Sequence, residues 1–64
     1  MIRIKAMKEY REKKRFSRAD LAGRVGVHKD TIARYERGER SPSAKTLKKI
    51  AEALGCSADE LLRE

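Results

Sequence analysis

The apolar residues of this chain recur three or four positions apart along almost its whole length, which is the spacing of amphipathic helices. In the segment Arg3–Lys14 the apolar stripe consists of Ile4, Met7 and Tyr10 or Arg11. A second stripe, farther along the chain, consists of Leu47, Ile50, Ala51 and Leu54. Clusters of β-branched residues are missing, and Pro42 is the only proline. The pattern therefore predicts an all-α fold.

Glycine, serine and proline residues divide this pattern into five predicted helices. They are Arg3–Lys14, the segment between Ser17 and Gly26, the segment from His28 or Lys29 to Arg37, the segment between Ser43 and Gly55, and a short segment after Ser57. Ser17 with Asp20, and Ser57 with Glu60, have the spacing of helix-capping pairs. Residues 39–43 are predicted to form a loop. With 64 residues the chain is expected to form one compact domain over residues 1–64.

The spacing of Leu21-Ala22, Gly26-Val27 and Ile32 predicts a helix-turn-helix between the second and third helices. Ala22 is expected to be small because the next helix passes close over it. Gly26 is expected in the turn, where a side chain would clash and where a positive φ is needed. Val27 and Ile32 would hold the third helix against the second. In this arrangement the third helix would project from the surface of the domain.

The net charge of +7 is confined to one part of the chain. Residues 1–40 contain 13 Lys or Arg against 6 Asp or Glu, whereas residues 41–64 contain 4 of each kind. A basic face of this kind indicates a polyanionic partner, of which nucleic acid is the commonest. No apolar run approaches the roughly 20 residues that span a bilayer. With the single cysteine Cys56 and no signal peptide, we expect a cytoplasmic protein without disulfides.

The whole string of residues resembles the lambda-repressor-like family, the Xre/Cro-type helix-turn-helix domains. The residues that carry the resemblance are Arg11, Ser17, Leu21-Ala22, Gly26-Val27, Ile32, Glu36, Gly38, Pro42-Ser43, Leu47, Ile50-Ala51, Leu54-Gly55 and Leu61. They cover nearly the whole chain in the order and spacing of that family. The resemblance implies a five-helix domain that binds double-stranded DNA, usually as a homodimer on a palindromic operator, with the helix at about 28–37 in the major groove.

The resemblance also implies roles for individual residues. Positions expected to contact bases are Lys29, Asp30, Thr31, Ala33 and Arg34. Positions expected to contact the DNA backbone are Ser17, Arg18, His28, Arg37, Gly38 and Arg40. A structural ion pair that faces inward is expected between Arg11 and Glu36.

Three positions depart from what the family often has. Arg18 stands where glutamine contacts phosphate, and His28 stands where serine caps the third helix. Arg15 stands where many members have glycine, so a left-handed backbone there would cost about 1 kcal/mol. These departures concern the first loop and the start of the recognition helix.

The sequence thus predicts a sequence-specific transcriptional regulator, most often a repressor in this family. An antitoxin or another protein-interaction module on the same fold is an alternative, and so is the N-terminal domain of a longer repressor. We expect neither an enzyme nor a cofactor, because the chain has no glycine-rich phosphate loop and little room for a cleft. A metal site is not expected either, since His28 is the only histidine.

Overall fold

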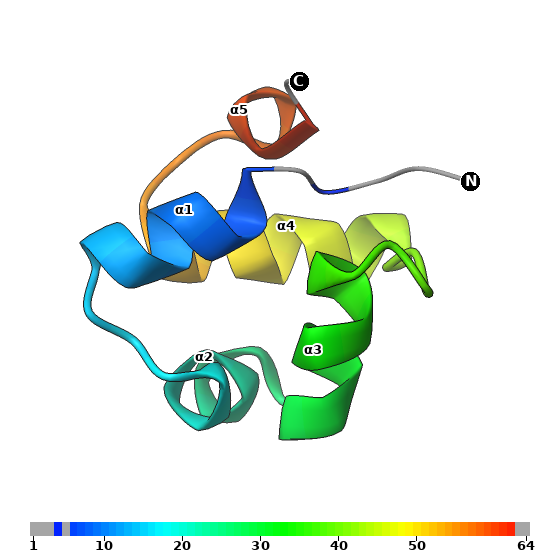
Figure 1. The fold of residues 1–64 in the computed structure, drawn as a ribbon. Coiled ribbons are helices and arrows are strands. Elements are labelled where there is room, and N and C mark those ends of the chain that lie inside the picture. Colours follow the sequence, from blue (N-terminus) through cyan, green and yellow to red (C-terminus); the bar gives the residue numbers. More distant parts are fainter. Residues whose placement is uncertain (1–3, 5, 63–64) are drawn as a thin grey trace.

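The computed structural model describes Ile4 and residues 6–62, and these residues form five helices (Figure 1). The helices are α1 (Met7–Lys13), α2 (Arg18–Val25), α3 (Lys29–Glu36), α4 (Ala44–Leu54) and α5 (Ala58–Leu62). The described residues contain no strand, so the predicted all-α fold is confirmed.

The first and third helices are shorter than the sequence predicted. Helix α1 begins at Met7, and Ile4 lies before it as a buried residue that is 2% exposed. The carbonyl of Ile4 accepts a hydrogen bond from the Met7 N–H at 3.3 Å, which forms a tight turn ahead of the helix. The predicted start at Arg3 lies outside the described residues. Helix α3 ends at Glu36, with Arg37 as its C-cap residue.

Helices α2 and α3 form the helix-turn-helix, and α4 packs against α2; in the view of Figure 1 it runs above α2 and behind α1. Leu21, Ala22 and Ile32 fill the space between these helices and are 0%, 3% and 0% exposed. Helix α5 lies on the opposite side of the molecule from α2 and packs against α4. One continuous apolar core therefore connects all five helices, and its members are Ile4, Met7, Leu21, Ala22, Val25, Ile32, Tyr35, Ile50, Ala51, Leu54 and Leu61.

The turn between α2 and α3 depends on the backbone conformation of Gly26. Its φ is +85°, in the left-handed region that side chains disfavour. A Cβ atom built at Gly26 would meet no atom within 4 Å. The expected steric clash is therefore wrong, whereas the expected positive φ is present. Glycine is favoured here because of backbone conformation, not because another helix approaches closely.

The loop between α1 and α2 contains Arg15, the one described non-glycine residue with a positive φ, at 59°. The family often has glycine at this position, and this chain keeps the left-handed turn despite its side chain. Arg15 is exposed, so the conformation is imposed by the loop and not by packing of its own side chain.

An ion pair ties α1 to the end of α3. Nε of Arg11 lies 2.6 Å from Oε2 of Glu36, and these side chains are 10% and 2% exposed. The same guanidinium donates through Nη1 to the carbonyl of Phe16 at 2.7 Å. Arg11 therefore links α1, the following loop and the C-terminal end of α3.

We expect Arg15→Gly to raise the free energy of unfolding by up to about 1 kcal/mol, because glycine adopts a left-handed φ without the Cβ strain. Thermal and urea unfolding would measure the gain. The matched control is Lys14→Gly, at a neighbouring residue with a φ of −83°, which should give no gain. Equal effects of the two substitutions would contradict strain at Arg15.

We expect Arg11→Ala to lower the free energy of unfolding by about 3–5 kcal/mol, because it leaves a buried carboxylate without its closest partner. Circular dichroism melts would measure the loss. The control is Lys13→Ala, whose ion pair with Glu9 joins side chains that are 67% and 69% exposed, and which should cost less than about 1 kcal/mol. A loss as small as that of the control would show that the Arg11 pair is not a buried one.

Candidate nucleic-acid interface

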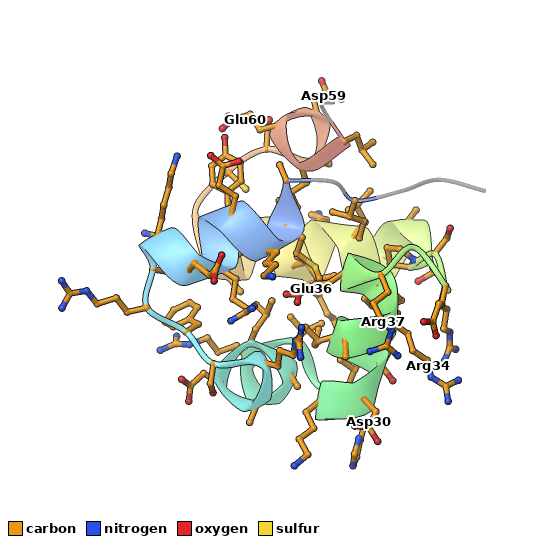
Figure 2. The ribbon with its side chains drawn as sticks, in the orientation of Figure 1. Asp30, Arg34, Glu36, Arg37, Asp59 and Glu60 are labelled. Carbon is orange, nitrogen blue, oxygen red and sulfur yellow. The ribbon has the colours of Figure 1, made fainter. Side chains whose placement is uncertain are left out.

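Helix α3 presents a polar face away from the body of the molecule. Ile32 and Tyr35, 0% and 5% exposed, hold its inner face against the core. Lys29, Asp30 and Arg34 are exposed on the outer side, and Thr31 and Ala33 are partly exposed beside them. Figure 2 shows Asp30 and Arg34 pointing outward, while Glu36 of the same helix points inward toward α1. The five residues expected to contact bases are therefore on the accessible side of one short helix.

The chemistry of this face is mixed. Lys29 and Arg34 supply N–H donors, and the carboxylate of Asp30 supplies acceptors. Thr31 and Ala33 add methyl groups. Donors suit the O6 and N7 acceptors of guanine, carboxylates accept from the N4 of cytosine, and methyl groups contact thymine. Such a face can match more kinds of base edge than a uniformly basic one, whose donors suit only acceptors such as those of guanine.

His28 forms the N-cap of α3. Its backbone is extended, and its Nδ1 accepts a hydrogen bond from the N–H of Asp30 at 3.1 Å. This geometry requires the imidazole proton to be on Nε2. His28 is exposed, as is Asp30, whose Oδ2 lies 3.6 Å from Nδ1. An imidazole therefore performs the capping role for which the family often uses a serine hydroxyl.

Helix α2 begins with a reciprocal capping box between Ser17 and Asp20. The Ser17 hydroxyl accepts from the Asp20 N–H at 2.9 Å, and the Ser17 N–H donates to Asp20 Oδ2 at 2.8 Å. The backbone donor of Ser17, with its hydroxyl, lowers the pKa of the Asp20 carboxyl below its ordinary value. The stabilisation is therefore present at neutral pH and is lost as the pH falls through that lowered pKa.

Arg18 is the first residue of α2, and its side chain turns toward the end of α3. Its Nε donates to Oε1 of Glu36 at 3.0 Å, and 45% of its side chain is exposed. The other carboxylate oxygen of Glu36, Oε2, accepts the hydrogen bond from Nε of Arg11. The Glu36 carboxylate thus receives two guanidinium groups, one from the interior and one from the surface.

The segment after α3 contains the remaining residues that the sequence assigned to the DNA backbone. Arg37 donates to Glu39 through Nε at 2.5 Å and through Nη2 at 3.3 Å. This contact raises the pKa of Arg37 and lowers that of Glu39. Gly38 has a φ of 73°, and Arg40 is exposed beyond it. Arg37 is therefore partly neutralised by its neighbour, unlike the exposed Arg34 and Arg40, for which the described residues show no ion pair.

Sequence reasoning did not predict the contacts of Arg18 with Glu36 and of Arg37 with Glu39. The first joins residues 18 positions apart, which no local spacing reveals. The second joins residues two positions apart, which do not face one another on a helix and meet here because the chain turns at Gly38. The alternating charges of residues 34–40 were the only available signal, and they did not specify partners.

The described part of the chain contains neither a metal-binding cluster nor a membrane-spanning helix. No group of three or more His, Cys, Asp or Glu side chains lies close enough together to hold a metal ion. None of the described helices has the length and the apolar character needed to cross a membrane.

We expect His28→Ala to lower the free energy of unfolding by about 1 kcal/mol, because α3 loses the acceptor at its N-cap. His28→Asn is the matched variant that keeps an acceptor, and it should retain or exceed the stability of the original chain. Thermal unfolding of the three proteins at neutral pH would measure this. If the alanine and asparagine variants unfold at the same temperature, the imidazole does not cap α3.

Comparisons with known proteins agree with this geometry. A family model described as helix-turn-helix matches residues 7–61. The P22 c2 repressor, solved in complex with a synthetic operator, is 35% identical with a TM-score of 0.85, and the match covers 89% of this chain and 86% of that one. SinR, a master regulator for biofilm formation solved in complex with DNA, is 34% identical with a TM-score of 0.82, over 89% of this chain and 92% of that one.

Curated relatives bear similar descriptions. An uncharacterized HTH-type transcriptional regulator from Archaeoglobus fulgidus is 36% identical over 55 residues, which are 86% of this chain and 78% of that protein. Three relatives from Bacillus subtilis are longer, and the chain spans about half of their length. The matched family model, the shared fold and these relatives lead to one conclusion: the chain belongs to the lambda-repressor-like, Xre-type family of helix-turn-helix domains.

Proposed function

We propose that this protein is a sequence-specific transcriptional repressor that inserts α3 into the major groove of double-stranded DNA. The observation that carries the proposal is the division of α3 into two faces. Ile32 and Tyr35 are buried, whereas Lys29, Asp30 and Arg34 are exposed with mixed hydrogen-bonding chemistry. A helix anchored in this way can enter a groove without rearrangement of the core. The P22 c2 repressor and SinR, which share this fold and whose structures contain DNA, support DNA as the partner.

In this proposal the base contacts come from Lys29, Asp30, Thr31, Ala33 and Arg34. The phosphate contacts come from Ser17, Arg18, His28, Arg37, Gly38 and Arg40, which lie at the start of α2 and at both ends of α3. Arg37 must share its guanidinium between Glu39 and phosphate, so Arg40 is the stronger electrostatic contact of the two. The protein binds a palindromic operator as a homodimer, with half-sites about one helical turn apart.

Selection of bound duplexes from a random pool tests this proposal directly. We expect enrichment of a palindromic motif, and affinity that falls steeply with salt concentration because phosphate contacts release counterions. Failure to enrich any motif would overturn sequence specificity. A motif without two-fold symmetry, or a monomer on DNA in sedimentation velocity, would overturn the dimeric arrangement.

Two single substitutions separate base contacts from phosphate contacts on the selected duplex. Arg34→Ala should cost about 1–3 kcal/mol of binding free energy and relax the preference at one base pair. Arg40→Ala should weaken binding equally on all sequences and reduce the salt slope by about 1. The control is Lys13→Ala, on α1 and paired with Glu9, which should change neither quantity. Fluorescence anisotropy titrations at several salt concentrations would measure all three variants.

A further inference from the structure

We propose that Glu36 is a positioning residue for DNA binding, which orients the guanidinium of Arg18 so that its outer N–H groups donate hydrogen bonds to a backbone phosphate. This inference rests on the proposed function. It assigns to the interior carboxylate a second role beyond stabilising α1 against α3.

The Glu36 carboxylate is held from the interior of the molecule by Arg11. Its side chain is 2% exposed, and Arg11 contacts both oxygens, through Nε to Oε2 at 2.6 Å and through Nη2 to Oε1 at 3.4 Å. Arg11 is held in turn by the Phe16 carbonyl. A carboxylate fixed on this side can orient a second donor that approaches from the other side.

Arg18 uses only one of its N–H donors in its contact with Glu36. A guanidinium has five N–H groups in a rigid plane, and the one on Nε points differently from the four on the terminal nitrogens. Arg18 contacts Glu36 through Nε, and among the described residues its terminal nitrogens show no hydrogen bond. The guanidinium therefore bridges: its inner edge is bound to the protein, and its outer edge is available at the surface, where 45% of the side chain is exposed.

The charges of Arg11, Arg18 and Glu36 do not cancel. Two guanidinium groups share one carboxylate, so the cluster of Arg11, Arg18 and Glu36 has a net charge of +1. Arg11 is buried, and the excess positive charge therefore faces solvent at Arg18. This position is the first residue of α2, where the helix dipole also favours an anion. A phosphate at this point would complete the neutralisation of the cluster.

Lysine would reproduce this arrangement poorly. Its ammonium has three donors at the end of a flexible chain, so a contact with Glu36 does not fix the direction of the donors that remain for phosphate. This difference separates two hypotheses: if only the charge at position 18 matters, lysine should replace arginine without loss, whereas a bridge requires the planar group.

The first experiment compares Arg18→Lys and Arg18→Gln on the duplex selected by the wild-type protein. Both variants leave the pair of Arg11 and Glu36 intact. We expect Arg18→Lys to weaken binding roughly tenfold despite its retained charge, because a hydrogen-bonded ionic contact loses its preset geometry. Arg18→Gln should weaken binding at least as much and reduce the salt slope by about 1. The control is Arg24→Lys, at the other end of α2, which should change affinity less than about twofold.

The second experiment is a double-mutant cycle with Glu36→Gln. If Glu36 positions Arg18, Glu36→Gln weakens DNA binding in the chain that has Arg18 and has little effect in the Arg18→Gln background. If Glu36 instead only competes with phosphate, Glu36→Gln strengthens binding, and the inference is wrong. Thermal unfolding first establishes that each variant is folded at the assay temperature. If Glu36→Gln is not, the Nε–H signal of Arg18 described next takes its place as the test of the contact with Glu36.

A third measurement follows the Arg18 contact itself and does not depend on a change in affinity. In the free, 15N-labelled protein the Nε–H of Arg18 should give a signal protected from solvent exchange, and this signal should persist in the complex. Its loss on DNA binding would show that Arg18 leaves Glu36, which overturns the bridge. Wild-type affinity for Arg18→Lys would overturn it as well. If the wild-type protein selects no duplex, the proposed function fails and the bridge fails with it, whatever the free protein shows.

Discussion

The burial of the Glu36 carboxylate is the constraint on which the arrangement of the first three helices depends. A carboxylate that is 2% exposed is costly unless its oxygens are paired. The chain meets this requirement with Arg11 from α1 and Arg18 from α2. Three helices must therefore converge on one side chain, and a shift of any of them would leave a charge unpaired in the interior. An apolar contact at this point would tolerate such shifts far better.

This constraint explains how a helix of eight residues is held rigidly enough for the reading role proposed for it. Ile32 and Tyr35 hold one face of α3 by apolar packing, which resists separation but not sliding. The ion pair at Glu36 adds a directional contact at the C-terminal end, and the His28 cap orders the first turn. On the outer face, the side chains of Lys29 and Arg34 are exposed and take no part in these contacts. They can therefore vary without a cost to the apolar core.

The three departures from the family pattern are each accommodated by a different physical means. Arg15 adopts a left-handed backbone that glycine would adopt without strain. His28 replaces a hydroxyl acceptor by an imidazole nitrogen, which accepts only in one tautomer. Arg18 replaces a neutral amide by a cation and turns one edge of it toward Glu36. All three residues are accommodated because each lies in a loop or at the start of a helix, outside the apolar core.

The sequence by itself determined the helical class, the order of the helices and most of the apolar core, because these follow from local periodicity and capping residues within one or two turns. It also predicted the left-handed turn at Gly26 and Arg11 as the partner of Glu36, the latter only through resemblance to a family. The tertiary structure alone decided that α1 begins at Met7, that no clash requires Gly26, and that Arg18 and Arg37 have the carboxylates of Glu36 and Glu39 as partners. The reason is that several arginines and glutamates lie within a few residues of one another after position 33. Their charges are equivalent in a linear sequence, and only the relative positions of α1, α2 and α3 bring particular ones within hydrogen-bonding distance.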